Sequence, residues 1–128
     1  CSYFKFYLKP ESKFWQEVKR NIKNISFTRL ESWASAGVPD LLCYNKKGSF
    51  FTVELKVSKG KKPTFSPHQI AFHMKHPNNT FILQKVLDPL AIKLYEGKDI
   101  LELVDRNKDP EPCALGLDAC GLWLENVE

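Results

Sequence analysis

The first apolar pattern along the chain has the spacing of a helix. Its apolar side chains recur at three- and four-residue intervals and define one stripe: Phe14, Trp15, Val18, Ile22 and Ile25. The pattern predicts a helix over 12–24, with Ser12 as its N-terminal cap. Residues 26–31 follow with the pattern of a short strand.

Two further strand-like segments, 40–45 and 49–57, predict a hairpin. The sequence Lys-Lys-Gly at 46–48 forms the expected turn. A three-residue turn at this place pairs each residue i of the first strand with residue 94 − i of the second. Leu41 should therefore lie opposite Val53, with both side chains on the same face of the sheet.

The segment after the hairpin has the pattern of a second helix. Ser66 is a typical N-cap, and Pro67 fits the first helical position. We expect this helix to run to about residue 75 and to end before the proline at position 77. An apolar strand is then expected over 81–87.

The last third of the chain has a weaker pattern. Residues 91–95 and 100–104 are strand-like, although 100–104 also fits a helix. Residues 105–112 are polar and predict a linker or loop, while 115–127 can be described only as a short docking segment. The order helix, strand, hairpin, helix, strand predicts an α/β fold with a mixed central sheet.

Composition narrows the class of protein. The chain has 128 residues, of which 43% are hydrophobic and 27% charged, as is typical of one globular domain. No apolar run is long enough to cross a bilayer. The net charge of +4 combines +10 over residues 1–86 with −6 over residues 87–128. The basic part fits a polyanion such as nucleic acid, and it fits a solvated basic surface equally well.

Cysteine and histidine usage points away from a zinc site or a disulfide framework. The four cysteines lack metal-ligand spacing, and their low density favours a reducing, intracellular setting. Cys43 lies in an apolar run and is expected in the core. The three histidines have no partner at ligand spacing, so we expect them at the surface or half-buried.

Candidate chemistry is found at the outer end of the predicted hairpin. The register sets Asp40 opposite Glu54, with Cβ atoms about 4.5–5.5 Å apart. Two carboxylates about 5 Å apart repel by roughly 3 kcal/mol at an effective dielectric near 20, whereas a divalent cation binds both. Lys56 projects from the same face, two residues after Glu54. A metal held there would polarise a scissile phosphate, and Lys56 would stabilise the charge that develops on it.

These residues occur in a recognisable order. Gly37-Val38-Pro39-Asp40 is followed after thirteen residues by Glu54-Leu55-Lys56, and then by Ser66-Pro67-His68-Gln69. The first two elements resemble the motif of the PD-(D/E)XK nuclease superfamily. The third is similar to the Ser-Pro-x-Gln element of its VRR-NUC and Holliday-junction-resolvase-like branch. The resemblance covers about residues 12–87.

The resemblance implies a restriction-endonuclease-like core, in which a mixed central β-sheet of about four strands is flanked by helices. The nuclease domain would span residues 1–104. Residues 105–128 would form a C-terminal linker and a short docking segment of the same domain. The implied reaction is hydrolysis of phosphodiester bonds with Mg²⁺ or Mn²⁺ as cofactor.

The resemblance also implies roles for individual residues. Asp40 and Glu54 would be metal ligands, and Lys56 would be the catalytic lysine. Gln69 would lie at the edge of the site and orient Lys56 or the phosphate. All four are therefore candidate catalytic residues.

Many members of this superfamily add a glutamate from the first helix. Glu17 is our candidate for this additional catalytic residue and metal ligand, because it borders the apolar stripe. Glu31 on the predicted first strand and Glu11 at the start of the helix are alternatives. The sequence leaves the choice among them open.

Four basic residues are candidate phosphate contacts: Arg29, Lys59, Lys61 and Lys62. The alternative for the three lysines is a solvated loop, and the alternative for Arg29 is an ion pair with Glu31. Trp33, in the loop before the predicted hairpin, is a candidate for stacking on substrate bases.

The sequence thus predicts a metal-dependent endonuclease. DNA is favoured as its substrate, and RNA is the alternative that the sequence leaves open. A chain of this size has little room for a separate recognition domain, which favours branched, flapped or junction DNA over a long recognition sequence. Two alternatives stay open: a catalytically silent nucleic-acid-binding module, and a nuclease subunit whose targeting partner binds the acidic C-terminal third. The resemblance further suggests a homodimer, and the small size suits a protein of a phage-infected cell. No membrane partner is expected.

Overall fold

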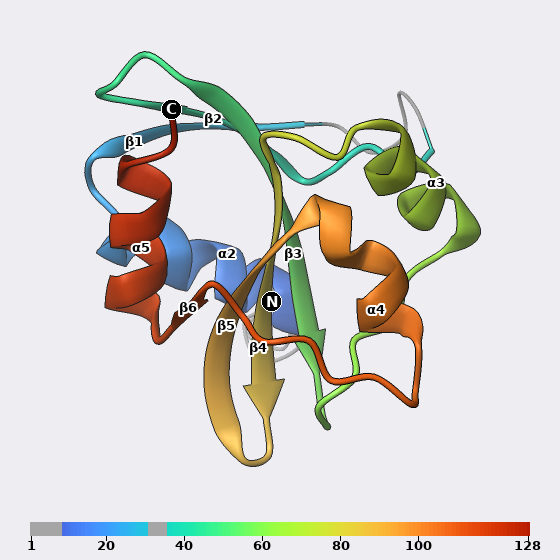
Figure 1. The fold of residues 1–128 in the computed structure, drawn as a ribbon. Coiled ribbons are helices and arrows are strands. Elements are labelled where there is room, and N and C mark those ends of the chain that lie inside the picture. The colour runs from blue at the N-terminus through green and yellow to red at the C-terminus, as the bar shows by residue number, and fades with distance from the viewer. Residues whose placement is uncertain (1–8, 31–35) are drawn as a thin grey trace, which may run out of the picture.

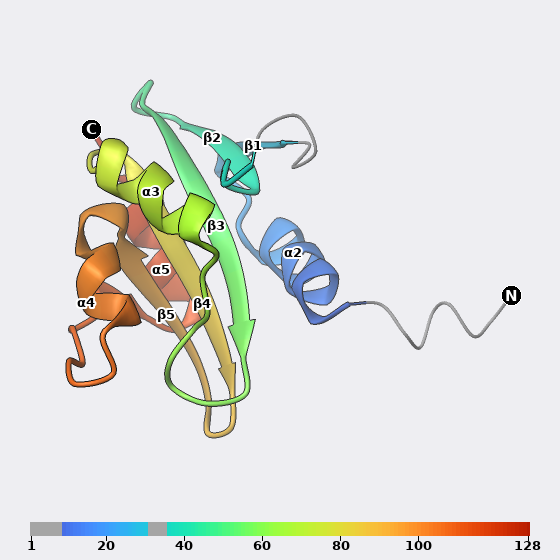
Figure 2. The same ribbon diagram turned by 90° about the vertical axis from the view of Figure 1, so that its right-hand side faces the viewer.

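The computed structural model describes residues 9–30 and 36–128, which form a six-stranded sheet with helices on both faces (Figures 1 and 2). The elements follow one another along the chain as α2 (Pro10–Asn21), β1 (Ile25–Arg29), β2 (Leu41–Asn45), β3 (Phe50–Ser58), α3 (Pro67–Lys75), β4 (Thr80–Leu87), β5 (Leu90–Glu96), the 3-10 turn η2 (Gly97–Asp99), α4 (Ile100–Val104), β6 (Ala114–Leu115) and α5 (Leu117–Glu125). The fold is therefore α/β, as the order of elements predicted.

The strands lie in the sheet in the order in which they occur along the chain, from β1 to β6. Only β3 and β4 are parallel, and α3 forms the crossover between them. All other neighbouring strands are antiparallel, so the sheet is mixed. It has six strands rather than the expected four or so, because β5 and the two-residue strand β6 extend it beyond β4.

The hairpin has the register that its turn length predicted. Leu41 pairs with Val53 and Tyr44 with Phe50, as the 94 − i relation requires. Gly48 has a φ of +82°, a value that glycine adopts without the penalty a side chain would incur. The Asn45 side chain accepts hydrogen bonds from backbone N–H groups in the turn and so fixes the pairing.

One helix begins earlier than the sequence predicts, and one segment for which two structures were considered is a helix. α2 starts at Pro10 rather than after Ser12, because proline at the first helical position already suits a helix start. Residues 100–104 form helix α4, the second of the two structures considered for them. α3 begins as predicted, with Ser66 as its N-cap.

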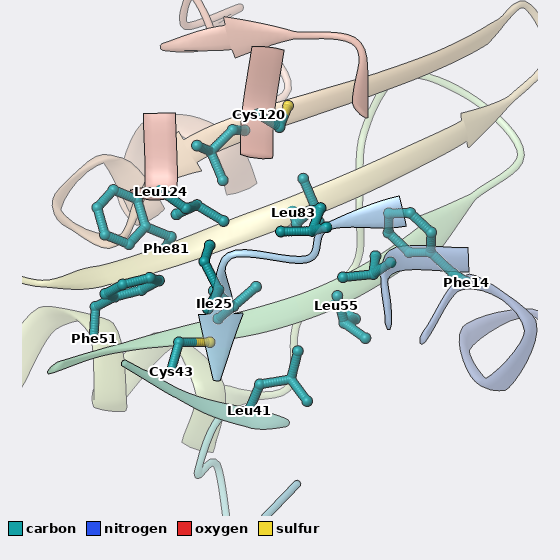
Figure 3. Packing of buried hydrophobic residues seen from close by; sticks show 14 residues of the cluster. Phe14, Ile25, Leu41, Cys43, Phe51, Leu55, Phe81, Leu83, Cys120 and Leu124 are labelled. Atoms are coloured by element: carbon teal, nitrogen blue, oxygen red, sulfur yellow. The ribbon is translucent and has the colours of Figure 1, made fainter. Parts of the chain in front are cut away.

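Strand alternation divides the apolar side chains between the two faces of the sheet. The larger cluster packs α2 and α5 on one face, and Figure 3 shows its side chains, including Phe14, Leu55, Leu83 and Leu124. The smaller cluster packs α3 and α4 on the other face, around Ile82. In Figure 2, where the sheet is seen close to edge-on, α2 lies on the opposite side from α3 and α4.

Residues 105–128 pack against their own chain. β6 pairs with β5, and Cys120 and Leu124 of α5 belong to the larger core cluster. Asn45 in the hairpin donates to the carbonyl oxygens of Leu124 and Val127. The segment that was expected to be a short docking segment of the same domain therefore covers one side of this core.

Cys43 is buried in the larger cluster, as expected, whereas His73 is not where the sequence suggested. His73 is fully buried, because α3 turns it toward the sheet, where its ring lies beside Gly97. No helix within residues 9–30 and 36–128 is long and apolar enough to cross a membrane.

Candidate active site

The Asp40 side chain continues the hydrogen bonding between β2 and β3 just beyond the last backbone pair. The last paired residues are Leu41 and Val53. Beyond them, the Asp40 Oδ2 atom accepts a hydrogen bond of 2.8 Å from the backbone N–H of Leu55. The Asp40 carbonyl oxygen accepts another of 2.8 Å from the backbone N–H of Leu30. These contacts hold the Asp40 carboxylate against β3 beside Glu54.

Glu54 is a buried carboxylic acid with an unsatisfied oxygen. The residue is 2% exposed, and its Oε1 atom has no hydrogen-bond partner among the described residues. Burial raises its pKa far above the ordinary value, and hydrogen bonding with Asp40 and the negative charge there raise it further. The positive charge of Lys56 opposes this rise. In the protein alone, therefore, the pair retains a proton at neutral pH.

Lys56 is held on the same face of β3 by two partners. Its Nζ atom donates a 2.9 Å hydrogen bond to Gln69 Oε1, and it lies 4.8 Å from the centre of the Phe65 ring. The same Gln69 oxygen accepts from the backbone N–H of Ser66, while the Ser66 hydroxyl accepts from Gln69 N. The reciprocal cap that starts α3 thus also fixes the acceptor of the Lys56 ammonium.

Gly37 brings the loop before Asp40 against the start of α3. It has a φ of +82°, and a Cβ at this position would lie 2.4 Å from the carbonyl oxygen of His68. Glycine is therefore the residue that permits this approach of two backbones. The contact connects the segment carrying Asp40 with the helix carrying Gln69.

The structure brings Asp40, Glu54, Lys56 and Gln69 together, but it does not bring Glu17 to them. Glu17 forms a 2.7 Å ion pair with Lys85. Lys85 pairs with Val57 across the β3–β4 ladder, whereas Glu54 pairs with Ile82. Because successive residues alternate, Lys85 and Glu17 lie on the α2 face of the sheet, opposite Glu54.

Glu11, the alternative at the start of the same helix, is electrostatically coupled to the site. Its pKa is raised, first by burial and also by the negative charge of Asp40, while Lys56 lowers it. The negative charge of Glu11 in turn raises the pKa of Glu54. The other alternative, Glu31, and the stacking candidate Trp33 lie outside the described residues.

The candidate phosphate contacts have differing environments. Lys62 donates to the backbone carbonyls of Glu102, Leu103 and Lys108, so its charge is directed at the end of α4. Lys61 forms an exposed ion pair of 3.5 Å with Asp109.

Lys59 and Arg29 are exposed, at the end of the β3–α3 connection nearest β3 and at the end of β1 respectively. Part of the basic loop thus contacts the acidic C-terminal third of the same chain. Lys59 and Arg29 keep the exposure that a phosphate contact requires.

The donor set at the site suits a hard divalent cation. Asp40 and Glu54 supply carboxylate oxygens, and one Glu54 oxygen has no other partner in the part of the chain that the structure describes. A cation bound between the two carboxylates would replace the proton that they otherwise retain. No group of three or more His, Cys, Asp and Glu residues is arranged as a metal site within the described ranges.

One contributor to this site was missed from the sequence, and a second was named only as an alternative. Phe65, under the Lys56 ammonium, carried no sequence signal beyond its position before the Ser66 cap. Glu11 was an alternative, and its place in the first helical turn was its only distinguishing feature. Comparisons with family models, with curated proteins and with solved structures found no match for this chain.

Proposed function

We propose that the chain is a metal-dependent nuclease that hydrolyses phosphodiester bonds in DNA. The observation that carries the proposal is the buried, partly unsatisfied carboxylate of Glu54, held beside Asp40 and Lys56. A carboxylate pair of this kind costs stability in the protein alone, and a dication together with an anionic substrate offsets that cost. The sequence resemblance to PD-(D/E)XK nucleases supports the same assignment.

In this proposal Asp40 and Glu54 hold Mg²⁺ or Mn²⁺. Glu11 replaces Glu17 as the additional acidic residue, and it acts through its charge rather than as a third metal ligand. The bound cation would polarise the scissile phosphate and lower the pKa of a coordinated water. Asp40 keeps its orientation because Leu55 N–H occupies Oδ2. The neutral Glu54 carboxyl group would release its proton to solvent when the cation binds.

Lys56 stabilises the negative charge that grows on the phosphate during hydrolysis. Its Nζ atom donates to Gln69 and lies over the Phe65 ring, so the ammonium is oriented before substrate arrives. Gln69 acts as a positioning residue, since its contact is with Lys56. No covalent intermediate is required, because water is the nucleophile.

Cleavage of a labelled DNA panel tests the proposal. The panel holds single strand, duplex, 5′ flap, splayed arm and four-way junction, each with Mg²⁺, Mn²⁺ or EDTA. We expect metal-dependent cutting by the wild type, preferentially of the branched or flapped substrates, and a loss of at least about 100-fold in Lys56→Met. Salt-sensitive binding of these substrates without any cutting would instead support a silent binding module or a subunit that awaits its partner.

A further inference from the structure

A ladder of side-chain pairs leads from the candidate site to the tip of the β2–β3 hairpin. Leu42 pairs with Thr52, and Tyr44 pairs with Phe50. Alternation along β3 places Phe50, Thr52 and Glu54 on one face of the sheet, the face that carries the site. The aromatic pair therefore lies on the same surface as the buried carboxylate.

Tyr44 and Phe50 are exposed although both are large aromatic residues. Tyr44 is 43% exposed and Phe50 is 60% exposed. Their ring centroids are 4.5 Å apart and the ring planes are tilted by 49°, so the rings pack on each other at the surface. In contrast, the apolar residues one position along each strand, Cys43 and Phe51, are buried in the larger core cluster.

The surroundings of the pair are polar and partly basic. Ser26 of β1 lies opposite Tyr44, and Thr28 lies opposite Leu42. Both β1 residues are exposed, and Lys46 in the turn is exposed as well. Cationic groups beside exposed aromatic rings are the elements with which proteins bind single nucleic-acid strands.

The aromatic pair lies within a few nucleotide lengths of the candidate site. Phe50 precedes Glu54 by four residues, which corresponds to about 13 Å at the usual strand rise. A stacked nucleic-acid strand advances about 3.4 Å per nucleotide. A base on the aromatic pair would therefore lie about four nucleotides from a phosphate at Glu54.

We propose that Tyr44 and Phe50 form a stacking platform for unpaired bases of the strand that the site cleaves. Stacking needs a base with a free face, which a paired and stacked duplex does not offer. The platform would therefore select substrates with a single-stranded segment next to the cut, such as a flap or a splayed arm. This inference rests on the proposed nuclease function.

Binding without turnover tests the platform separately from the chemistry. The probes are a fluorescein-labelled oligo(dT) and a labelled hairpin duplex whose loop is too short for its bases to stack on the aromatic pair. Binding of both is measured in EDTA by fluorescence anisotropy. We expect Tyr44→Ala and Phe50→Ala each to weaken oligo(dT) binding by about 5- to 100-fold, with duplex binding changed less than about twofold. Tyr44→Phe should bind oligo(dT) as the wild type does.

Trp123→Ala is the matched control, because Trp123 is an aromatic residue of similar exposure on α5, which packs on the other face. It should leave oligo(dT) binding unchanged. Circular dichroism and urea unfolding verify that each variant is folded. Unchanged oligo(dT) binding in both alanine variants would overturn the platform, and so would equal weakening of oligo(dT) and duplex.

The two proposals fail in different ways. Wild type that binds oligo(dT) through the aromatic pair but never cuts would overturn the nuclease and leave the platform as a binding site. Wild type that cuts while the alanine variants bind oligo(dT) normally would overturn the platform alone. An aromatic pair that serves a protein contact instead would show in sedimentation as a dimer lost in Phe50→Ala, with nucleic-acid binding intact.

Discussion

Replacing Glu54 by glutamine is predicted to stabilise the protein at neutral pH. The carboxyl group is 2% exposed and lies beside Asp40, and both burial and Asp40 raise its pKa from the ordinary value of 4.5. The folded wild type must therefore bind a proton that the unfolded chain releases. Glutamine has nearly the same shape, carries no charge and can donate its amide hydrogen to the Asp40 carboxylate.

The magnitude follows from proton linkage. Below about pH 4.5, Glu54 is protonated in both the folded and the unfolded wild type. In that range it therefore contributes nothing to the dependence of stability on pH. As pH rises above that value, the unfolded state loses the proton while the folded state keeps it. The free energy of unfolding then falls by about 1.4 kcal/mol per pH unit, or roughly 3 kcal/mol between pH 5 and pH 7. Direct repulsion of two charges about 5 Å apart also gives ~3 kcal/mol.

Urea unfolding in EDTA at pH 5, 6 and 7 measures this effect. The difference in free energy of unfolding between Glu54→Gln and wild type should increase with each step of pH. Glu111→Gln, an exposed carboxylate in the loop before β6, is the control and should show no such increase. A Glu54→Gln variant that is less stable than wild type at pH 7, or a constant difference across the three pH values, would refute the reasoning.

Three further variants probe the supports of the site. Gly37→Ala should lose about 1–3 kcal/mol in urea unfolding, because its Cβ meets the His68 carbonyl and its φ is positive. Gln69→Ala should lower kcat for cleavage by about 10- to 100-fold with little change in KM, since Lys56 loses a charged hydrogen bond. Burial lowers the pKa of His73 to about 4. As pH falls from 6.5 towards 4, the unfolded state therefore binds a proton at His73 that the folded state does not bind. His73 thus removes about 3 kcal/mol of stability over that range, and His73→Leu should abolish this part of the pH dependence.

Two of these variants have a matched control that separates their cause from a general loss of stability. Gly60→Ala adds a Cβ where nothing lies within 4 Å, so it should leave stability nearly unchanged. Ser66→Ala removes the side-chain cap of α3 while Gln69 is retained. It should lower the free energy of unfolding, and it should lower kcat less than Gln69→Ala does. A dependence of stability on pH between 6.5 and 4 that is the same in His73→Leu as in wild type would contradict the assignment to His73.

Local chemistry explains which parts of the fold could be predicted. The length of the Lys-Lys-Gly turn determines which residues of β2 and β3 face each other, so the register and the Asp40–Glu54 proximity followed from spacing alone. Ser66 and Pro67 act within one helical turn, so the start of α3 was equally accessible. Helix α4 was ambiguous because five residues are too few to distinguish helical from strand periodicity.

The remaining features depend on packing between distant segments. Glu17 borders the apolar stripe of α2, but only the docking of α2 on the far face of the sheet directs it to Lys85. Lys62 has the sequence context of a phosphate contact, and its role at the end of α4 depends on where residues 102–108 lie. His73 is buried because α3 packs against the sheet. The sequence of α3 alone does not show that this side of the helix faces the sheet.

Cleavage of a labelled 5′-flap DNA by wild type, Glu54→Gln and Glu111→Gln, measured side by side with Mg²⁺ and with EDTA, tests the central claim most directly. The account predicts that wild type and Glu111→Gln cut the flap only with Mg²⁺. It predicts that Glu54→Gln is folded, binds the flap and cuts at least about 100-fold more slowly, because one of the two proposed metal ligands is lost. Equal cutting by Glu54→Gln and wild type, or cutting by wild type in EDTA, would contradict it.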